Sequence, residues 1–312
     1  MQRPLHCGSL SVKDNLLRPA KCVSSLPNIA IVLSRPLLMQ IKSRGCAQRH
    51  ASTMREAVST AMASPEQNRL LATLGAEVRA RIFPHLELVS LPLGEVLYES
   101  GDAPSHAYFP IDSIVALQHR LASGASVEIS LVGNHGLLGI TSCMGGDSAP
   151  RQAVVIGEGL AYRLPTQRLK DEFNRHGELL RVLLRYTQSL MTQIAQTVVC
   201  NGHHSVDRRL CTWLLFALDR VPGNQLTVTQ ELIAEMLGVR RETIAEAAHQ
   251  LRRLGVIEYC RGRLTVRDRR QLEQLSCECY GVVKKEADRL LPDPARTSRS
   301  KRVPLLATVA SL

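Results

Sequence analysis

The polar side chains between Arg240 and Arg253 are of the types that hydrogen-bond nucleic acid. At helical spacing, one face of this segment presents arginine, glutamate and glutamine, at Arg240, Arg241, Glu242, Glu246, Gln250 and Arg253. Guanidinium groups donate to guanine edges or to phosphates, and carboxylates accept from cytosine amines. The segment is therefore a candidate for contact with DNA, although a surface helical hairpin with solvated charges would show the same pattern.

Two short helices joined by a tight turn are predicted to carry these side chains. Apolar residues share one helical face before Gly238 and again after it, at Leu232, Ile233, Met236, Leu237, Ile244, Ala247, Ala248, Leu251 and Leu254. Gly238 supplies a turn without a side-chain penalty, so residues 229–254 predict a helix-turn-helix. A helix over 206–220 precedes it, a β-hairpin wing over 256–266 turns at Arg261-Gly262, and a helix over 269–286 follows.

Cysteine and histidine side chains are the other candidates, for metal binding, oxidation sensing or catalysis. Cys200-Asn-Gly-His203-His204 and Cys277-Glu-Cys279 resemble metal half-sites, but neither has a second ligand set at a known spacing, so no metal site is predicted. Cys7, Cys22 and Cys46 are spaced too loosely for an iron-sulfur cluster. Cys143 is a candidate oxidation sensor by location alone. A catalytic Cys200/His203 pair lacks an orienting acid, so no catalytic residues are predicted.

The basic charge of the chain lies mainly in its ends. The formal net charge is +11, but residues 1–62 carry 9 Lys and Arg against 2 acids, residues 63–200 carry 11 against 13, residues 201–283 carry 12 against 10, and residues 284–312 carry 7 against 3. Electrostatic attraction to DNA therefore depends on local arginine clusters. Scattered cysteines without a convincing signal peptide indicate reduced thiols in a cytoplasmic protein, and no apolar run is long enough to span a membrane.

Residues 86–164 have the pattern of a small β-rich domain. Short alternating apolar runs are broken by turn residues at Gly94, Gly101-Asp102, Gly124, Gly133-Asn134 and Gly145-Gly146-Asp147. Evenly spaced short strands of this kind predict an antiparallel barrel or jelly roll. A helix over 65–83 precedes the strands, and Pro165 begins a helix after them.

A long helix over 178–199, ended by Asn201-Gly202, is predicted to join the two regions. Apolar residues recur on it at near-heptad intervals, at Leu179, Leu183, Tyr186, Leu190, Ile194 and Thr197. This pattern favours a dimer helix, and packing of the helix on its own barrel is the alternative.

The fold class expected is α+β, with five segments. Residues 1–61 are an unpatterned basic extension expected to be disordered, and its composition is also typical of an organelle transit peptide. Met54 and Met62, just before the first patterned helix, are further candidate translation starts. Residues 62–176 form the β-roll, 177–200 the dimer helix, 201–285 the winged helix-turn-helix, and 286–312 a disordered tail.

The order of these parts resembles the Crp/Fnr family of bacterial transcription regulators over roughly residues 63–285. Gly238-Val-Arg-Arg-Glu-Thr-Ile244 resembles the start of the family's recognition helix, and Leu93-Gly94-Glu95 through Gly101-Asp102 resembles its sensor domain. The resemblance implies double-stranded DNA, a second copy of the chain and RNA polymerase as partners, with no membrane association.

Carried over by position, the resemblance assigns roles on the DNA. Arg241 would pair with a guanine and Glu242 with a cytosine, whereas Glu246 stands where well-known members place another base-reading arginine. Thr229, Gln230, Arg240 and Thr243 would contact the DNA backbone, as would Arg261 and Arg263 on the wing. A solvated hairpin tip is the alternative for the last two.

The sensor region departs from the pattern of cyclic-nucleotide-binding relatives. There a Gly-Glu pair holds the ribose and an arginine holds the cyclic phosphate; here Gly139 is followed by Ile140, while Arg151 is kept. Loss of the ribose acceptor costs about 1 to 3 kcal/mol in a buried pocket, so ordinary cyclic AMP binding is not expected. Gly139, Arg151 and Gln152 remain candidates for a small anionic effector, and a degenerate pocket is the alternative. No cofactor is assigned.

The leading hypothesis is thus a homodimeric, site-specific DNA-binding regulator on a pseudo-palindromic operator. A sequence-tolerant architectural DNA-binding protein without a ligand is the alternative, and an enzyme is disfavoured. Activator and repressor roles depend on where the operator lies, which these residues do not encode.

Overall fold

Seven strands form two antiparallel sheets in the N-terminal half of the computed structural model, which describes residues 63–122, 126–146, 148–260 and 262–292. One sheet has the order β1-β7-β3 and the other β2-β6-β4-β5. The strands are β1 (Glu87–Leu91), β2 (Val96–Tyr98), β3 (His106–Pro110), β4 (Ile114–Arg120), β5 (Ser126–Val132), β6 (Gln152–Gly157) and β7 (Gly159–Pro165). The predicted jelly roll is confirmed, with each predicted apolar run contributing one strand. The expectation for residues 1–61 lies outside the described residues.

The segment before the strands differs from the single helix predicted over 65–83. It is divided into η1 (Pro65–Gln67), α2 (Arg69–Ala72), α3 (Ala76–Ile82) and η2 (Phe83–His85). Asn68 separates the first two because its side chain accepts hydrogen bonds from the amides of Leu70 and Leu71 as an N-cap, and Gly75 in an extended conformation begins α3. Local capping therefore overrides the continuous apolar period.

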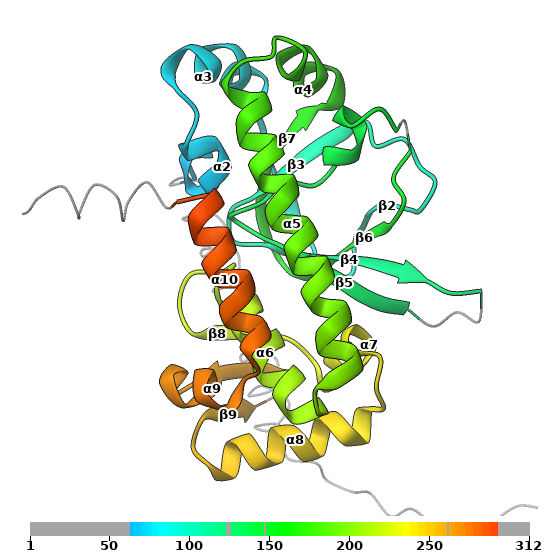
Figure 1. Ribbon diagram of the computed structural model, residues 1–312, viewed down its shortest axis with the longest axis vertical. Coiled ribbons are helices and arrows are strands. Elements are labelled where there is room, and N and C mark those ends of the chain that lie inside the picture. The colour runs from blue at the N-terminus through cyan, green and yellow to red at the C-terminus, as the bar shows by residue number, and fades with distance from the viewer. Residues whose placement is uncertain (1–62, 123–125, 147, 261, 293–312) are drawn as a thin grey trace, which may run out of the picture. The chain divides into compact units, whose positions relative to one another are not determined.

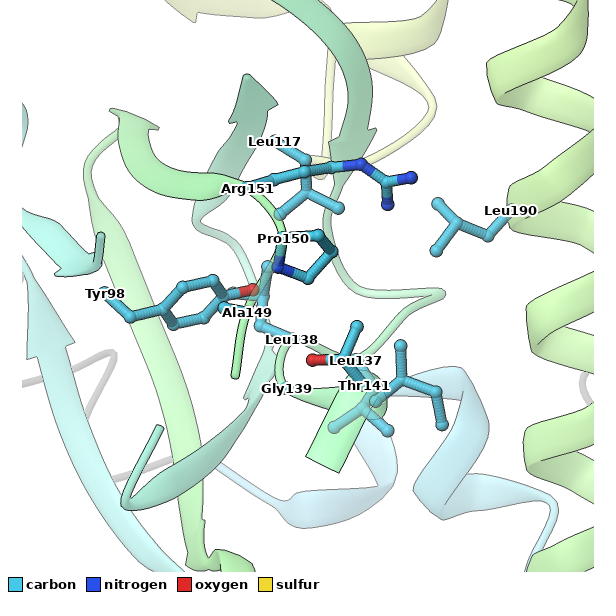
Figure 2. A pocket seen from close by; sticks show the side chains of 11 residues that line it. Tyr98, Leu117, Leu137, Leu138, Gly139, Thr141, Ala149, Pro150, Arg151 and Leu190 are labelled. Carbon is cyan, nitrogen blue, oxygen red and sulfur yellow. The ribbon is translucent and has the colours of Figure 1, made fainter. Parts of the chain in front are cut away.

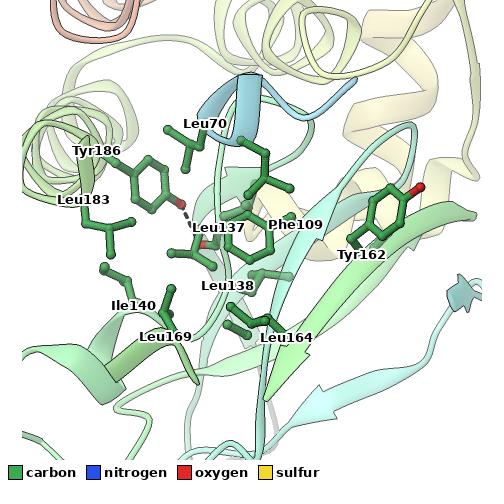
Figure 3. Packing of buried hydrophobic residues seen from close by; sticks show 14 of the residues in the cluster. Leu70, Phe109, Leu137, Leu138, Ile140, Tyr162, Leu164, Leu169, Leu183 and Tyr186 are labelled. Carbon is green, nitrogen blue, oxygen red and sulfur yellow. Dashed lines mark hydrogen bonds between the residues drawn. The ribbon is translucent and has the colours of Figure 1, made fainter. Parts of the chain in front are cut away.

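The core of the β-roll lies between the two sheets and extends to the helices that follow them. Phe109, Leu138 and Leu164 are almost fully buried there together with Leu169 of α4 (Thr166–Phe173). Figure 3 shows Leu183 and Tyr186 of α5 (Glu178–His203) facing this cluster, with the Tyr186 hydroxyl donating to the Leu137 carbonyl at 2.8 Å. The long helix is thus part of the sensor core.

The residues predicted for the dimer contact take part in this packing. Leu179, Leu183, Tyr186 and Leu190 are buried and Ile194 is partly buried, all against the chain's own β-roll core. A side chain already removed from water within one chain has little surface left to offer a partner. The exposed large apolar side chains of α5 are others: Leu184 at 56%, Met191 at 65%, Val198 at 66% and Val199 at 45% of their full surface.

Helix α5 is also longer than predicted, because Asn201-Gly202 does not end it. It continues to His203, and His204 is its C-cap, with its amide bonded to the carbonyl of Cys200. Among the described residues, no helix is long and apolar enough to cross a membrane.

The C-terminal half contains the predicted winged helix-turn-helix. It consists of α6 (Val206–Leu218), α7 (Gln230–Leu237), α8 (Arg241–Arg253), the wing strands β9 (Ile257–Cys260) and β10 (Arg263–Val266), and α9 (Arg269–Leu275). A third strand that the sequence analysis missed, β8 (Gln225–Thr227), pairs with β10 and completes a sheet of order β8-β10-β9.

The last helix begins and ends elsewhere than expected. The predicted helix over 269–286 is broken at Ser276 and Cys277, both extended, and α10 (Glu278–Leu290) follows, so residues 286–290 are helical and not part of a loose tail. Figure 1 shows α10 running back beside α5, and Leu290 and Leu291 are buried in the β-roll core. The chain therefore leaves the sensor core along α5 and returns to it along α10.

A second hydrophobic cluster joins the β-roll to the winged helix-turn-helix half. Ile114, Ala116 and Leu131 of the β2-β6-β4-β5 sheet are buried with Leu210, Leu214 and Leu218 of α6 and with the inner faces of α7 and α8. The two halves consequently share apolar surface that neither could leave exposed without cost.

Four side chains with polar groups are buried at this junction. Trp213 of α6 donates its indole N–H to Glu128 Oε2 of β5 at 2.7 Å. Arg220 donates to the Leu131 carbonyl at 3.0 Å and to Gln193 Oε1 of α5 at 2.9 Å. Burial raises the pKa of Glu128 to about 7, although the Trp213 hydrogen bond and the charge of Arg220 oppose the shift. The Glu128 carboxyl group therefore gains or loses its proton near pH 7 while it is buried in the junction.

Glu128→Gln should change how the free energy of unfolding depends on pH. The pKa of Glu128 lies above its ordinary 4.5, so the native state retains the proton that the unfolded state releases. Wild-type stability then falls as pH rises from about 4.5 to about 7, by about 3 kcal/mol at most. Glutamine keeps the acceptor for Trp213 and stays neutral. The free energy of unfolding of the variant should therefore rise relative to that of the wild type over this pH range.

Urea unfolding at several pH values measures this difference. Glu235→Gln, which changes an exposed carboxylate on α7, is the matched control and should follow the wild-type curve. A constant offset between Glu128→Gln and wild type from about pH 5 to about pH 8 would contradict the prediction.

Candidate functional site

The turn between α7 and α8 explains why glycine stands at position 238. Gly238 has φ +62°, the left-handed region that other residues rarely adopt. Its amide bonds to the Glu235 carbonyl at 3.1 Å, and the amide of Val239 bonds to the Ala234 carbonyl at 3.0 Å. These two bonds form a Schellman motif, which satisfies the last carbonyls of α7 and turns the chain sharply into α8.

Helix α8 is divided into a buried and an exposed face. Ile244, Ala247, Ala248 and Leu251 are buried in the second cluster. The predicted base-reading residues Arg241, Glu242 and Glu246 are all exposed on the opposite face. The structure thus brings these three side chains together on one accessible surface at and near the N-terminus of the helix.

Arg241 has an intramolecular partner on this surface. Its Nε lies 3.6 Å from Glu231 Oε2 of α7, with both side chains largely exposed. An exposed pair of this kind contributes between about 0 and 1 kcal/mol. It therefore orients the guanidinium without holding it strongly, and a bidentate acceptor can displace it.

The predicted backbone contacts lie on the rim of the same surface. Thr229 is the N-cap of α7, where its hydroxyl oxygen accepts from the Leu232 amide at 3.1 Å and keeps its own hydrogen free to donate. Arg240, Thr243 and Arg263 are exposed, and Gln230 is half-buried at the first position of α7. Arg261 lies outside the described residues.

The β-roll contains a small pocket beside α5. Tyr98, Gly139, Arg151 and Leu190 line it, together with Leu117, Leu137, Leu138, Ile140, Thr141, Ala149 and Pro150. Figure 2 shows the Arg151 guanidinium extending toward Leu190 of α5. The free volume is about 20 Å³, which holds only one or two water molecules. Buried Arg151 Nε has no hydrogen-bond partner.

Two other predicted effector residues have different surroundings. Gln152 does not line this pocket; its side chain accepts from Gln118 at 2.8 Å and donates to Glu99 at 2.8 Å. Gly139 does line it, but its backbone hydrogen-bonds the Tyr98 hydroxyl, so that donor is already engaged. Ile140, the residue that replaces a ribose-binding acid, is buried in the pocket wall. The pocket thus keeps Arg151, whose buried Nε lacks an acceptor.

Cys143 is poorly suited to act as an oxidation sensor. It is half-buried at the end of η3 (Ile140–Cys143), and burial raises the pKa of its thiol to about 11. A protonated thiol is a weak nucleophile toward oxidants.

Four residues that the sequence analysis left unpaired are brought together by the fold. Cys200 and His204 at the end of α5 meet Cys277 and Cys279 at the start of α10, with their ligand atoms all within 4.8 Å of one another. Each half-site alone had no second ligand set at a known spacing. The two half-sites could have been paired if the return of α10 along α5 had been foreseen. The prediction of one continuous helix over 269–286 did not include the break at Ser276 and Cys277 from which α10 begins.

Family models match both halves of the chain. The model of the cyclic nucleotide-binding domain matches residues 88–176, and the model of the Crp-like helix-turn-helix domain matches residues 208–275. The global nitrogen regulator of Synechococcus elongatus is 24% identical over 209 residues, which is 64% of this chain and 93% of that protein. The global nitrogen regulator of a Nostoc species is 22% identical over the same shares.

Solved structures show the same fold. FixK2 from Bradyrhizobium japonicum superposes with a TM-score of 0.54 at 18% identity, covering 62% of this chain and 98% of its own. A CRP-family transcriptional regulator from Thermus thermophilus superposes with a TM-score of 0.51 at 20% identity, covering 60% and 96%. With a cyclic nucleotide-binding domain followed by a Crp-like helix-turn-helix domain in this fold, the chain belongs to the Crp/Fnr family of transcription regulators.

Proposed function

We propose that the protein binds a specific pseudo-palindromic DNA operator as a homodimer and that an anion in the β-roll pocket controls this binding. The observation that carries the proposal is the exposed face of α8, where Arg241, Glu242 and Glu246 lie together above a buried apolar face. RNA polymerase at a nearby promoter is the partner on which a DNA-bound regulator of this kind acts.

The chemistry of α8 supports direct reading of bases. An α-helix fits the major groove, where arginine pairs with guanine O6 and N7 and glutamate accepts from the cytosine amine. Arg241 and Glu242 are the first two residues of the helix, the end that recognition helices direct at base edges. Glu246 repels a guanine, so the operator should carry another base at that position. Thr229, Arg240, Thr243 and Arg263 would fix the register through phosphates.

Arg241→Ala should lower affinity for the selected operator by roughly 1 to 3 kcal/mol and relax the preference at one base pair per half-site. Operators are first obtained by selection from random DNA, and binding is then measured with single-base substitutions at fixed salt. Arg270→Ala, an exposed arginine on α9, is the matched control and should leave base preference unchanged. A uniform loss across all sequences would make Arg241 a phosphate contact, and equal binding to random DNA would indicate an architectural protein.

An exposed and mostly apolar stripe along α5 supports the dimer. Leu184, Gln188, Met191, Ala195 and Val198 follow one another at intervals of 4, 3, 4 and 3 and are all exposed. This is a heptad seam, and two copies of it can pair as a coiled coil. Because the residues named by the sequence analysis are buried in their own chain, the proposed contact lies at this stripe instead.

Met191→Glu should convert the dimer to a monomer and weaken binding to the full operator far more than binding to an isolated half-site. A charge at a central seam position has to be buried against its own copy, which is unfavourable. Light scattering after gel filtration gives the mass, and titration of both DNAs gives the affinities. Leu93→Glu, at a similarly exposed leucine in the β-roll, is the control. A Met191→Glu protein that remains dimeric would refute the stripe as the interface.

The effector proposal depends on Arg151. A buried guanidinium Nε without a partner is costly, and an anionic group would supply the missing acceptor. The pocket must widen to admit one, and Leu190 of α5 forms part of its wall. Entry of an anion would therefore displace the helix that carries the dimer stripe, which links the pocket to the DNA-binding surface.

Arg151→Gln should abolish stabilisation by the effector. Thermal unfolding of the full chain is measured with a panel of anionic metabolites that includes cyclic AMP and other nucleotides. The wild type and an Arg163→Gln control, which alters a partly exposed arginine paired with Glu87, should respond to the same anion, and cyclic AMP should give no shift. Stabilisation of the wild type by cyclic AMP would contradict the argument from Ile140.

A further inference from the structure

The cysteines at the junction of α5 and α10 form a cluster separate from both hydrophobic cores. Cys200, Cys277 and Cys279 are each at least 93% buried and pack with one another, not with the apolar side chains of either cluster. Cys211, by contrast, is buried among the leucines of the second core. Packing of small apolar side chains thus accounts for Cys211 but not for the other three.

The distances within this group match one tetrahedral ion. Cys200 Sγ lies 3.5 Å from Cys277 Sγ, and Cys279 Sγ lies 3.5 Å from His204 Nδ1. A tetrahedral zinc ion, with bonds of about 2.3 Å to sulfur and about 2.0 Å to nitrogen, separates its ligand atoms by roughly 3.5 to 3.8 Å. Because all four ligand atoms lie within 4.8 Å of one another, they enclose a single ion rather than a multi-iron cluster.

Hydrogen bonds around the four donors suit a metal-bound state. The other ring nitrogen of His204, Nε2, lies 3.2 Å from Glu278 Oε1, which fixes the tautomer that leaves Nδ1 as a ligand. Gln196 donates to Cys279 Sγ at 3.2 Å, and the Thr212 hydroxyl lies 3.0 Å from Cys277 Sγ. Donors of this kind stabilise thiolate, the form that binds metal.

We propose that Cys200, His204, Cys277 and Cys279 bind a structural zinc ion that fastens the end of α5 to the start of α10. A set of three thiolates and one imidazole fills all four positions of tetrahedral zinc and leaves none for a substrate. A cavity of about 40 Å³ lined by Cys200, Cys279 and Gln196 reaches the group and gives the ion a path of entry. All four residues lie outside the two segments that the family models match, 88–176 and 208–275.

The site would tie the two connections of the DNA-binding half together. Residues 205–276, which form the winged helix-turn-helix, lie between the two ligand pairs along the chain. Zinc binding adds its free energy to the folded state and should raise the temperature of unfolding. The zinc site does not depend on which operator or effector the protein uses.

Metal content of the full-length protein tests the proposal. Protein purified under a phosphine reductant is analysed by elemental mass spectrometry, stripped with a chelator, and titrated with zinc alone and with Co²⁺ alone. We expect one zinc per chain and a cobalt spectrum with thiolate-to-metal charge transfer and the strong visible bands of a tetrahedral site. Zinc should also raise the unfolding temperature of the stripped protein.

Three variants distinguish zinc binding at this site from other consequences of replacing a cysteine. Cys279→Ser should weaken zinc binding by more than the roughly 10- to 100-fold that loss of an outer hydrogen-bonding partner costs. Cys211→Ser, at the buried cysteine outside the group, is the matched control and should keep one zinc. His204→Cys should keep the metal but change the cobalt spectrum from three thiolates to four, which remains readable if Cys279→Ser does not fold.

Three outcomes would overturn the proposal. One is wild-type protein that binds no more zinc than Cys279→Ser; another is a cobalt spectrum that His204→Cys leaves unchanged. The third is a Cys200–Cys277 disulfide in the purified protein whose reduction does not allow zinc to bind.

Discussion

The buried contact between β5 and α6 is the constraint on which the arrangement of the two halves depends. Trp213 and Arg220 donate from α6 and its end to Glu128 and to the Leu131 carbonyl, in the middle of apolar side chains from both halves. These hydrogen bonds form only while the two halves are together, so separating the halves exposes apolar surface and breaks buried hydrogen bonds at once. A displacement in the β-roll would therefore be passed to α7 and α8 through a packed junction, not through a flexible linker.

At Gly133 the backbone that follows β5 lies very close to the Arg220 side chain. A Cβ at this position would lie 2.5 Å from Arg220 Cβ, closer than side chains tolerate. The backbone that follows β5 thus packs directly on Arg220, and Arg220 in turn donates to Gln193 of α5. One residue of the DNA-binding half consequently contacts a sensor strand and the long helix together, which places all three elements under a common steric constraint.

Much of this structure could be predicted from the sequence, and the failures have physical causes. Alternating apolar runs identified all seven β-roll strands, and Gly238 between two apolar periods identified the helix-turn-helix, because local pattern determines which face is buried. The same periodicity does not say which surface buries a face, so Leu183 and Tyr186 were assigned to a partner although their own β-roll covers them. The cysteine group could not be found locally, because Cys200 and Cys277 are separated by 77 positions and meet only when α10 returns along α5.

The return of α10 also changes what motions the DNA-binding half can make. A domain appended by one chain connection can swing and twist about it in any direction. Here the half is held by two connections, since Leu290 and Leu291 anchor α10 in the β-roll core while α5 enters from the same core. The ends of the two helices meet at Cys200 and Cys277. The DNA-binding half is therefore restrained at both of its chain connections as well as at the β5–α6 contact, which limits the swing that a domain on one connection would have.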